Sequence, residues 1–268
     1  KGGVHVSALP EESLRGLDVD VAVLGEGEIT MHELCCYGKD DWPKINGILY
    51  LEETGIHRNP ARELIEDLDI IPFTSRHLLS SPFNWYLIPP GVIRGAFSLY
   101  TTTMITSRGC PYNCLFCASC IVFGRHFRRR SVDNVIEEIR HLQEKYHIKG
   151  IWFLDDTFTF DREWVHKFCS ELIKRRIGLK WSCQTRVDRI DKELLSLMKL
   201  AGCTQLEIGV ESGSEKVLEQ LGKGISIKDL KEKFAQMKQL GLRTMANFMI
   251  GSPGENIEDI IATYRLAK

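Results

Sequence analysis

Two hydrophobic periods alternate along the chain from residue 101 onward. Short apolar runs are followed by stretches in which apolar residues return every three to four positions, the spacing of one helix face. Because parallel strands need a crossover between them, usually a helix, this order predicts five β/α units around one parallel sheet, either open or curled into a barrel. One strand is expected before Cys110, and the others are Gly150–Leu154, Leu179–Gln184, Gln205–Val210 and Thr244–Ile250.

The helices between these strands should each bury one face. Ser131 can cap the first of them. The next should stop near Gly178, because glycine readily adopts the left-handed conformation at a helix end. Later helices should end at Gly202 and Gly241. The expected buried faces are Val132, Val135, Ile136, Ile139, Leu142 and Tyr146 on the first helix, and Trp164, Val165, Phe168, Leu172 and Ile173 on the second.

The first hundred residues follow another pattern. An apolar strand, Val19–Leu24, lies between two short helical runs, which favours the tail of an α/β domain over residues 1–37. Six of the nine prolines fall between Pro43 and Pro90, so residues 38–100 are predicted to be a linker. A hairpin of residues 46–51 and 55–58 is expected within it. The chain starts without methionine and ends inside a helical pattern, so we expect a fragment.

Composition excludes several classes of protein. The chain of 268 residues is 43% apolar and 26% charged, with a net charge of −1, as in an ordinary globular protein. No apolar run reaches the roughly 18 residues that span a bilayer, and no signal peptide is apparent. The nine cysteines do not form the pattern of a small secreted disulfide scaffold. A cytoplasmic location with reduced thiols is therefore expected.

Three cysteines stand in a C-x3-C-x2-C pattern directly after the first expected strand: Cys110, Cys114 and Cys117. Soft thiolates at this spacing suit an iron–sulfur cluster or zinc. A structural zinc site needs four ligands, and no second Cys or His pair lies at a suitable separation. Three thiolates on a four-iron cluster would leave one iron open to a ligand. The alternatives are a structural metal knot and an electron-transfer cluster that also uses Cys120.

Polar residues follow the later strands, at the edge where parallel sheets place ligands. Each has a second interpretation. Asp155 or Asp156 could cap the following helix, Arg186 could pair with Asp188, and Ser212 could cap a helix. The residues at strand ends are Asp155, Asp156, Gln184, Arg186, Glu211, Ser212, Ile250 and Gly251.

The run Cys110-Pro-Tyr-Asn-Cys114-Leu-Phe-Cys117 resembles the signature of radical S-adenosylmethionine (SAM) enzymes. The resemblance covers residues 101–268 and implies a partial parallel (β/α) barrel, truncated here before its sixth strand. It implies a [4Fe-4S] cluster on the three cysteines, with SAM chelating the fourth iron, and makes Cys120 a bystander. It further assigns residues to SAM binding. Phe116 is the aromatic residue before the third cysteine, Asp155 and Asp156 would receive the amino group, Glu211 and Ser212 the ribose, and Ile250 and Gly251 the adenine. Gln184 and Arg186 end the third strand, where the arginine could bind the carboxylate.

The resemblance also implies an activity. In this family the reduced cluster splits SAM into methionine and a 5′-deoxyadenosyl radical, which abstracts hydrogen from an unactivated C–H bond. The protein must exclude water and orient the substrate. A small-molecule substrate and a reducing protein such as a flavodoxin or ferredoxin are the implied partners.

The amino-terminal piece is similar to the end of the Rossmann-like cobalamin-binding domain that precedes the radical SAM domain in one large subclass. The similarity lies in Gly2–Glu12 and in Val21–Glu28. It implies cobalamin in the full-length protein and a methylation or ring-forming reaction. The subclass motif Asp-x-His-x-x-Gly is absent, and His5 is not expected to replace it. An ordinary strand-to-helix turn is the other interpretation of Gly25–Glu28.

A basic run, Arg125–Arg130, raises the alternative of an RNA-modifying enzyme similar to radical SAM methylthiotransferases. Only Phe123 and Phe127 could stack on bases there. We therefore favour a solvated loop that leads to the Ser131 cap, and nucleic acid is disfavoured as a partner. A non-catalytic iron–sulfur or corrinoid carrier module is the alternative from a different class.

Overall fold

A computed structural model describes residues 1–16, 19–53, 55–79 and 101–268. The chain divides into two compact units. The first unit comprises Lys1–Ile71, Arg108–Tyr112 and Cys117–Arg128, and the second comprises Pro72–Ser107, Asn113–Phe116 and Arg129–Lys268. Residues 80–100 of the expected linker lie outside the described residues. The boundaries of the expected domains at residues 37 and 100 stay predictions.

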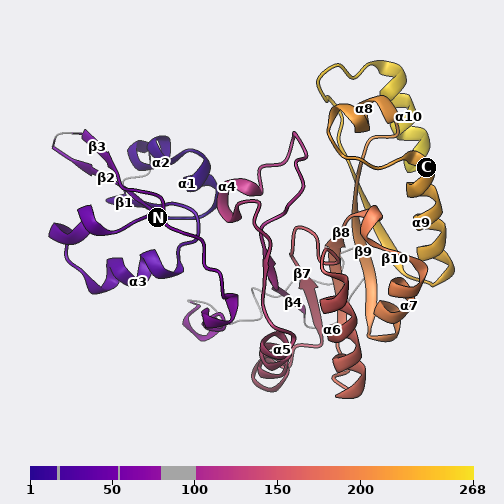
Figure 1. Ribbon diagram of the computed structural model, residues 1–268, viewed down its shortest axis with the longest axis horizontal. Coiled ribbons are helices and arrows are strands. Elements are labelled where there is room, and N and C mark those ends of the chain that lie inside the picture. Colours follow the sequence, from indigo (N-terminus) through magenta and orange to yellow (C-terminus); the bar gives the residue numbers. More distant parts are fainter. Residues whose placement is uncertain (17–18, 54, 80–100) are drawn as a thin grey trace. The chain divides into compact units, whose positions relative to one another are not determined.

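The second unit is built on a five-stranded parallel sheet, which confirms the predicted fold class (Figure 1). The strand order is β10-β9-β8-β7-β4, so each strand lies beside the one before it in the sequence. Such an order winds the chain in one direction, as in a partial barrel. The strands are β4 (Thr101–Met104), β7 (Gly150–Phe153), β8 (Lys180–Thr185), β9 (Cys203–Glu211) and β10 (Arg243–Phe248).

Helices connect these strands and lie along the outer side of the sheet (Figure 1). The side chain of Ser131 accepts a hydrogen bond from the Asn134 amide at 3.1 Å, so the predicted cap is confirmed. The apolar residues expected on the first helix face are buried, apart from Tyr146, which is half-buried. The helices are α5 (Val132–Tyr146), α6 (Arg162–Lys174), α7 (Lys192–Leu200), α8 (Glu215–Gln220), α9 (Ile227–Gln239) and α10 (Ile257–Ala267).

The end of α6 differs from the prediction. The helix stops at Lys174, and Arg176, with φ of 50°, takes the C′ position; Gly178 is also left-handed as predicted, with φ of 68°, but lies two residues beyond it. The Arg176 amide bonds the carbonyl of Ile173 and the Ile177 amide bonds that of Leu172, both at 3.1 Å. These two bonds form a Schellman motif with arginine in place of glycine. The hydrogen bonds of the motif therefore outweighed the preference for glycine.

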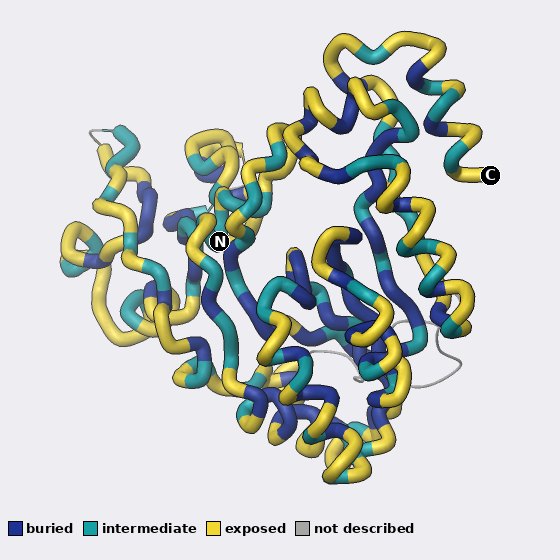
Figure 2. The backbone as a smooth tube through the Cα atoms, turned by 45° about the vertical axis from the view of Figure 1, so that its right-hand side comes forward, coloured by how far each residue is buried: buried dark blue, intermediate teal, exposed yellow. Residues whose placement is uncertain are grey.

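The core of the second unit contains a cluster of aromatic rings. Four fully buried side chains, Phe153, Phe158, Phe168 and Trp181, have ring centroids 4.9 to 6.0 Å apart. Figure 2 shows the strands largely in the colour of buried residues and the helices with exposed outer faces. Edge-to-face and offset pairs of this kind add to the stabilisation from buried area.

The first unit is smaller and has an antiparallel sheet in the order β1-β2-β3. The predicted hairpin is confirmed as β2 and β3, which pair over Leu49–Glu52 and Gly55–Arg58. Because β2 also pairs with β1, the hairpin belongs to the same sheet as the first expected strand. The elements are α1 (Val4–Ala8), α2 (Pro10–Gly16), β1 (Val21–Val23), α3 (Glu28–Cys36), β2 (Ile48–Glu52), β3 (Gly55–Arg58) and α4 (Cys120–Phe123), with 3-10 turns at Lys39–Lys44 and Leu68–Ile70.

The remaining elements are short. Strand β5 (Ser107–Arg108) pairs with β6 (Arg128–Arg129), and the second unit has 3-10 turns at Arg76–Leu78 and Val187–Arg189. Within the described residues, no helix has both the length and the apolar character needed to cross a bilayer.

Candidate functional site

The cysteine loop, residues 109–120, begins just after β4 and β5. In the part of the chain that the structure describes, none of its four cysteines forms a disulfide; Cys117 is exposed, and Cys110, Cys114 and Cys120 are half-buried. Among the described residues, no three Cys, His or carboxylate side chains converge as ligands of a single metal ion would. In a four-iron cluster each thiolate binds a different iron, so three such ligands do not converge on one point. The soft sulfur donors of the loop fit a cluster of this kind.

The middle of the loop, Asn113–Phe116, packs within the second unit. The Leu115 amide donates to the Leu221 carbonyl at 3.1 Å. The guanidinium Nη1 of Arg186 donates to the Cys114 Sγ at 3.7 Å. This contact places a cationic hydrogen-bond donor at the Cys114 sulfur, and hydrogen bonds to the sulfurs are a feature of iron–sulfur sites. This contact is the observation that best fits Cys114 as a cluster ligand.

Arg186 directly follows β8 and is 7% exposed. Besides Cys114, its guanidinium contacts both carboxylate oxygens of Asp188, at 2.9 and 3.1 Å, and the Lys223 carbonyl at 2.7 Å. The alternative pairing with Asp188 is therefore present. Binding of the SAM carboxylate by Arg186 stays a prediction. So does the role of Gln184, whose carbonyl accepts from the Phe158 amide at 3.0 Å.

Asp155 follows β7 and is buried. Its carboxylate accepts from the Thr106 amide at 3.1 Å, the Thr106 hydroxyl at 2.7 Å and the Ser107 hydroxyl. Arg129 Nη2 lies 3.8 Å away, and burial lowers the pKa of that guanidinium while Asp155 opposes the shift. Asp155 thus holds the segment just before the cysteine loop. Asp156 is exposed.

The helix-cap interpretation of these two aspartates is not what the structure shows. Asp161 caps α6, because its side chain accepts from the Trp164 amide at 3.0 Å. The contacts that the resemblance implies between Asp155 or Asp156 and the amino group of SAM stay predictions.

Glu211 ends β9 with φ of 68°, an uncommon conformation for a residue with a side chain. Its carboxylate accepts from Lys223 Nζ at 2.8 Å, and both side chains are buried. A Cβ atom on Gly209 would stand 2.4 Å from Glu211 Oε1 and 2.8 Å from Lys223 Nζ, so glycine leaves room for the pair. Lys223 Nζ also lies 5.7 Å from the ring centroid of Phe116, whose side chain is partly exposed.

Ser212, next in the chain, is fully buried. Its hydroxyl lies 3.0 Å from the Thr263 hydroxyl of α10 and accepts from the Ser214 amide at 3.1 Å. These bonds tie the end of β9 to α10. Contacts of Glu211 and Ser212 with ribose stay predictions.

The turn after β10 is held by one carboxylate. Glu255 Oε2 accepts from the amides of Gly251, at 2.5 Å, and Ser252, at 3.2 Å. The side chain of Ile250 is 61% exposed. The contact of Ile250 and Gly251 with adenine stays a prediction.

The residues after β7, β8, β9 and β10 share one edge, because all four strands are parallel neighbours. The family comparison is decisive at this point: the model described as "Radical SAM superfamily" matches residues 104–267. The chain belongs to the radical SAM superfamily. This confirms the resemblance drawn from the cysteine pattern, and [4Fe-4S] and SAM are the cofactors of that superfamily.

Individual relatives agree with the family. The chain is 36% identical over its whole length to "Uncharacterized methyltransferase PH0819" of Pyrococcus horikoshii and covers 57% of it. It is 31% identical over its whole length to the "Anaerobic magnesium-protoporphyrin IX monomethyl ester cyclase" of Rubrivivax gelatinosus and covers 48% of that protein. The chain thus spans about half the length of these relatives.

A solved structure has the same fold. It is the radical SAM methyltransferase TsrM of Kitasatospora setae, determined with cobalamin and a [4Fe-4S] cluster bound. The TM-score is 0.77 at 21% identity, over 98% of this chain and 52% of TsrM.

The interpretation of the basic run Arg125–Arg130 as a solvated loop is wrong for its last three residues. The side chains of Arg128, Arg129 and Arg130 are 2%, 5% and 12% exposed. They pair with Glu26 at 2.8 Å, Asp155 at 3.8 Å and Glu138 at 2.6 Å, respectively. These three charges therefore serve internal ion pairs. Arg125 and His126 are exposed.

The sequence analysis missed two features of the second unit. Lys223 lies in a glycine-flanked turn that has the pattern of a solvated segment, and nothing in that pattern signals its burial. Glu138 did carry a signal, since it lies on the apolar face of α5 between Val135 and Leu142, where it is buried. A carboxylate in such a position requires a buried cationic partner, and it has two, Arg76 at 3.1 Å and Arg130 at 2.6 Å.

Proposed function

We propose that the protein is a radical SAM enzyme that cleaves SAM reductively to a 5′-deoxyadenosyl radical. The proposed ligands of its [4Fe-4S] cluster are Cys110, Cys114 and Cys117. The observation that supports this proposal most strongly is the family match over residues 104–267, which begins at the end of β4 and includes these cysteines. The contact of Arg186 with the Cys114 sulfur supports the ligand assignment.

Each residue of the proposed site has a distinct task. A cluster held by Cys110, Cys114 and Cys117 would supply the electron for SAM cleavage. Arg186 holds the Cys114 thiolate, Asp155 fixes the segment before the loop, and Glu255 orders the turn proposed to meet the adenine. The hydrogen bond from Lys223 to Glu211 holds the Lys223 ammonium beside the Phe116 ring.

We further propose that the full-length protein uses cobalamin for a methylation or ring-forming reaction on an unactivated carbon of a small molecule. The names of the relatives from Pyrococcus horikoshii and Rubrivivax gelatinosus support these reaction types, and the bound cobalamin of TsrM supports the cofactor. A reducing protein such as a flavodoxin or ferredoxin is the proposed electron donor. Corrinoid absorbance in the full-length, cobalamin-supplied protein tests the cobalamin proposal, and its absence would reject it.

Anaerobic reconstitution tests the radical SAM proposal. The protein is supplied with iron, sulfide, dithionite and SAM, and the products are separated by liquid chromatography. A radical SAM enzyme yields 5′-deoxyadenosine and methionine. A carrier module would retain its cluster and leave SAM intact, and that result would overturn the proposal.

Substitution of single cysteines tests the ligand set. Changing Cys110, Cys114 or Cys117 to alanine should lower bound iron from about four atoms per chain to near zero, because each variant removes a ligand. The matched control is Cys120→Ala, which should retain full iron. Iron and sulfide assays on the purified, reconstituted proteins give the comparison, and loss of iron in the Cys120 variant would contradict the assignment.

A further inference from the structure

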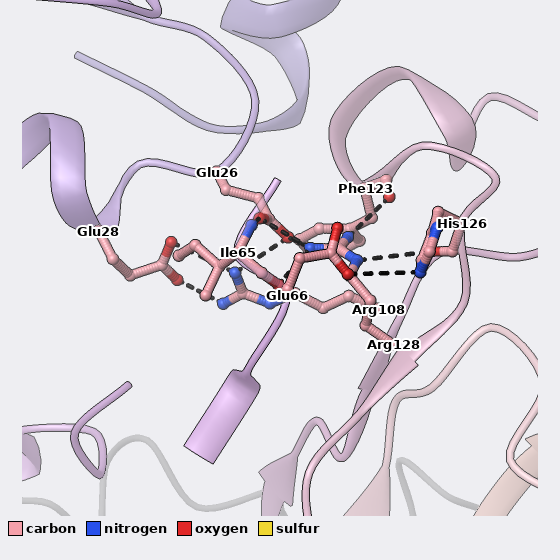
Figure 3. A network of polar contacts seen from close by, with 8 residues as sticks. All are labelled: Glu26, Glu28, Ile65, Glu66, Arg108, Phe123, His126 and Arg128. Atoms are coloured by element: carbon pink, nitrogen blue, oxygen red, sulfur yellow. Dashed lines mark hydrogen bonds and ion pairs between the residues drawn. The ribbon is translucent and has the colours of Figure 1, made fainter. Parts of the chain in front are cut away.

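The turn Gly25–Glu28 contains a buried carboxylate that the proposed function does not use. Glu26 lies at the centre of a polar network in the first unit (Figure 3), and its side chain is 1% exposed. Arg128 Nη1 donates to its two oxygens at 2.8 and 2.9 Å, and Arg108 Nη1 lies 3.2 Å from Oε1. The Ile65 amide donates to Oε2 at 2.7 Å. A charge this deeply buried requires such partners.

Arg128 is as deeply buried as Glu26 and links three segments. Beyond Glu26, its guanidinium donates to the Ile65 carbonyl at 2.8 Å and to the Phe123 carbonyl at 2.9 Å. Phe123 is the last residue of α4, which follows the cysteine loop. The position of Arg128 is therefore specified from both sides.

Arg108 lies just before Cys110 and shares the Glu26 carboxylate with Arg128. Its guanidinium also pairs with Glu28 and lies 5.2 Å from the ring centroid of Phe123. One carboxylate thus contacts cations from the segments on both sides of the cysteine loop. Figure 3 shows both arginines directed at Glu26.

The backbone segments before and after the cysteine loop also contact each other. A Cβ atom on Gly109 would stand 2.0 Å from the His126 carbonyl oxygen, and the residue has φ of 82°. The Cys110 amide donates to the Gly124 carbonyl at 3.4 Å. Backbone contacts therefore hold the two ends of the loop together, and Arg108 and Arg128 belong to the same two segments.

We propose that Glu26 is a positioning residue for the cysteine loop: its buried carboxylate binds Arg108 and Arg128 together and so sets the conformation in which Cys110 and Cys117 are presented. The turn Gly25–Glu28 then acts as a clamp on the loop. The expected effect on a bound cluster rests on the proposed function. The effect of Glu26 on the conformation of the loop does not, because it needs only contacts within the protein.

Hydrogen exchange measured by mass spectrometry on the metal-free chain tests the clamp. Glu26→Gln removes the negative charge, so the guanidiniums of Arg108 and Arg128 lose the carboxylate that they share. Amides in residues 108–128 of the first unit should then exchange about tenfold faster, whereas amides of β9 should be unchanged. The matched control is Glu28→Gln, which removes a carboxylate that pairs with Arg108 and is 37% exposed, and its effect should be smaller.

A double variant separates positioning from general stability. Glu26→Gln combined with Arg128→Met removes both partners, so little uncompensated charge stays buried. The melting temperature should recover relative to Glu26→Gln alone, while exchange in residues 108–128 stays fast. If exchange rises uniformly over the chain, or is the same in Glu26→Gln as in the unsubstituted protein, the proposal is wrong.

The reconstituted protein gives the spectroscopic readout. At equal iron content, the electron paramagnetic resonance spectrum of the reduced cluster in Glu26→Gln should be shifted or broadened relative to the unsubstituted protein. An identical spectrum would overturn the positioning role. If the unsubstituted protein binds no cluster, the proposed function fails, and the exchange result still decides about the clamp.

Discussion

The two units use buried side chains in different ways. The second unit has a large apolar core in which Phe153, Phe158, Phe168 and Trp181 pack ring against ring. The first unit has two small apolar clusters and a buried network around Glu26. Apolar packing is non-directional and scales with area, whereas buried charges demand specific partners. Buried ion pairs occur in both units, since Glu211–Lys223 and Glu138–Arg76 lie in the second. The difference is that the described part of the first unit has only small apolar clusters beside its ion pairs, so charge pairing makes up a larger share of its interior.

The largest expected effect concerns the apolar core. Phe168→Ala should lower the free energy of unfolding by about 3–5 kcal/mol, because it opens a cavity among four aromatic neighbours. Phe168→Leu should cost less, about 1–2 kcal/mol, since most of the volume is kept. Ile173→Ala, on the partly exposed face of the same helix, is the matched control. Urea titrations give the free energies of unfolding. Equal losses of this free energy in Phe168→Ala and in the control would contradict the view that the apolar core stabilises the second unit.

A smaller effect is expected at Arg186, where the second unit does use a buried charge. Arg186→Met removes the cationic donor to the Cys114 sulfur. The reduction potential of the reconstituted cluster should fall by tens of millivolts, because hydrogen bonds to the sulfurs stabilise the reduced, more negative form. Arg189→Met, which removes a nearby cation that contacts Phe160, is the control. An unchanged potential in Arg186→Met measured by redox titration would contradict this role.

The smallest effect is expected at Asp259, whose side chain is 11% exposed and pairs with the half-exposed Lys216. Hydrogen bonds from Ser214, Lys216 and the Asn256 amide lower the pKa of Asp259 to about 2 from an ordinary value of 3.8. A depressed folded-state pKa means stabilisation that is present at neutral pH and lost as pH falls from about 4 toward 2. The Asp259→Asn variant should therefore melt below the unsubstituted protein at pH 7.

The pH dependence of that difference is the measurement. Between pH 7 and 5 the gap in melting temperature should be constant, and below about pH 4 it should shrink. Ser196→Ala, which removes an exposed hydroxyl that donates to the Lys192 carbonyl, serves as a control whose gap should not depend on pH in this range. A gap that widens in acid would show that the sign of the linkage is wrong.

Local chemistry explains which parts of the fold could be predicted. The apolar face of α5, the Ser131 cap and the hairpin follow from periodicity and from nearest-neighbour hydrogen bonds, which act over a few residues. The end of α6 was missed because Arg176 adopts the left-handed conformation within a Schellman motif, which outweighs residue preference. The arginines at 128–130 were misread because their carboxylate partners come from distant segments: Glu26, Asp155 and Glu138.

The same division holds for the site. Three cysteines at fixed spacing after a strand already specify soft-metal chemistry, since ligand type and spacing are properties of the chain itself. The parallel sheet, and with it the edge that collects Asp155, Arg186, Glu211 and Gly251, follows from alternating strands and helices. Only the tertiary structure decided that Arg186 contacts the Cys114 sulfur, that Lys223 neutralises Glu211, and that Glu26 binds two arginines. These contacts join residues far apart in sequence, and the partner of a buried charge is chosen by packing, which no local pattern encodes.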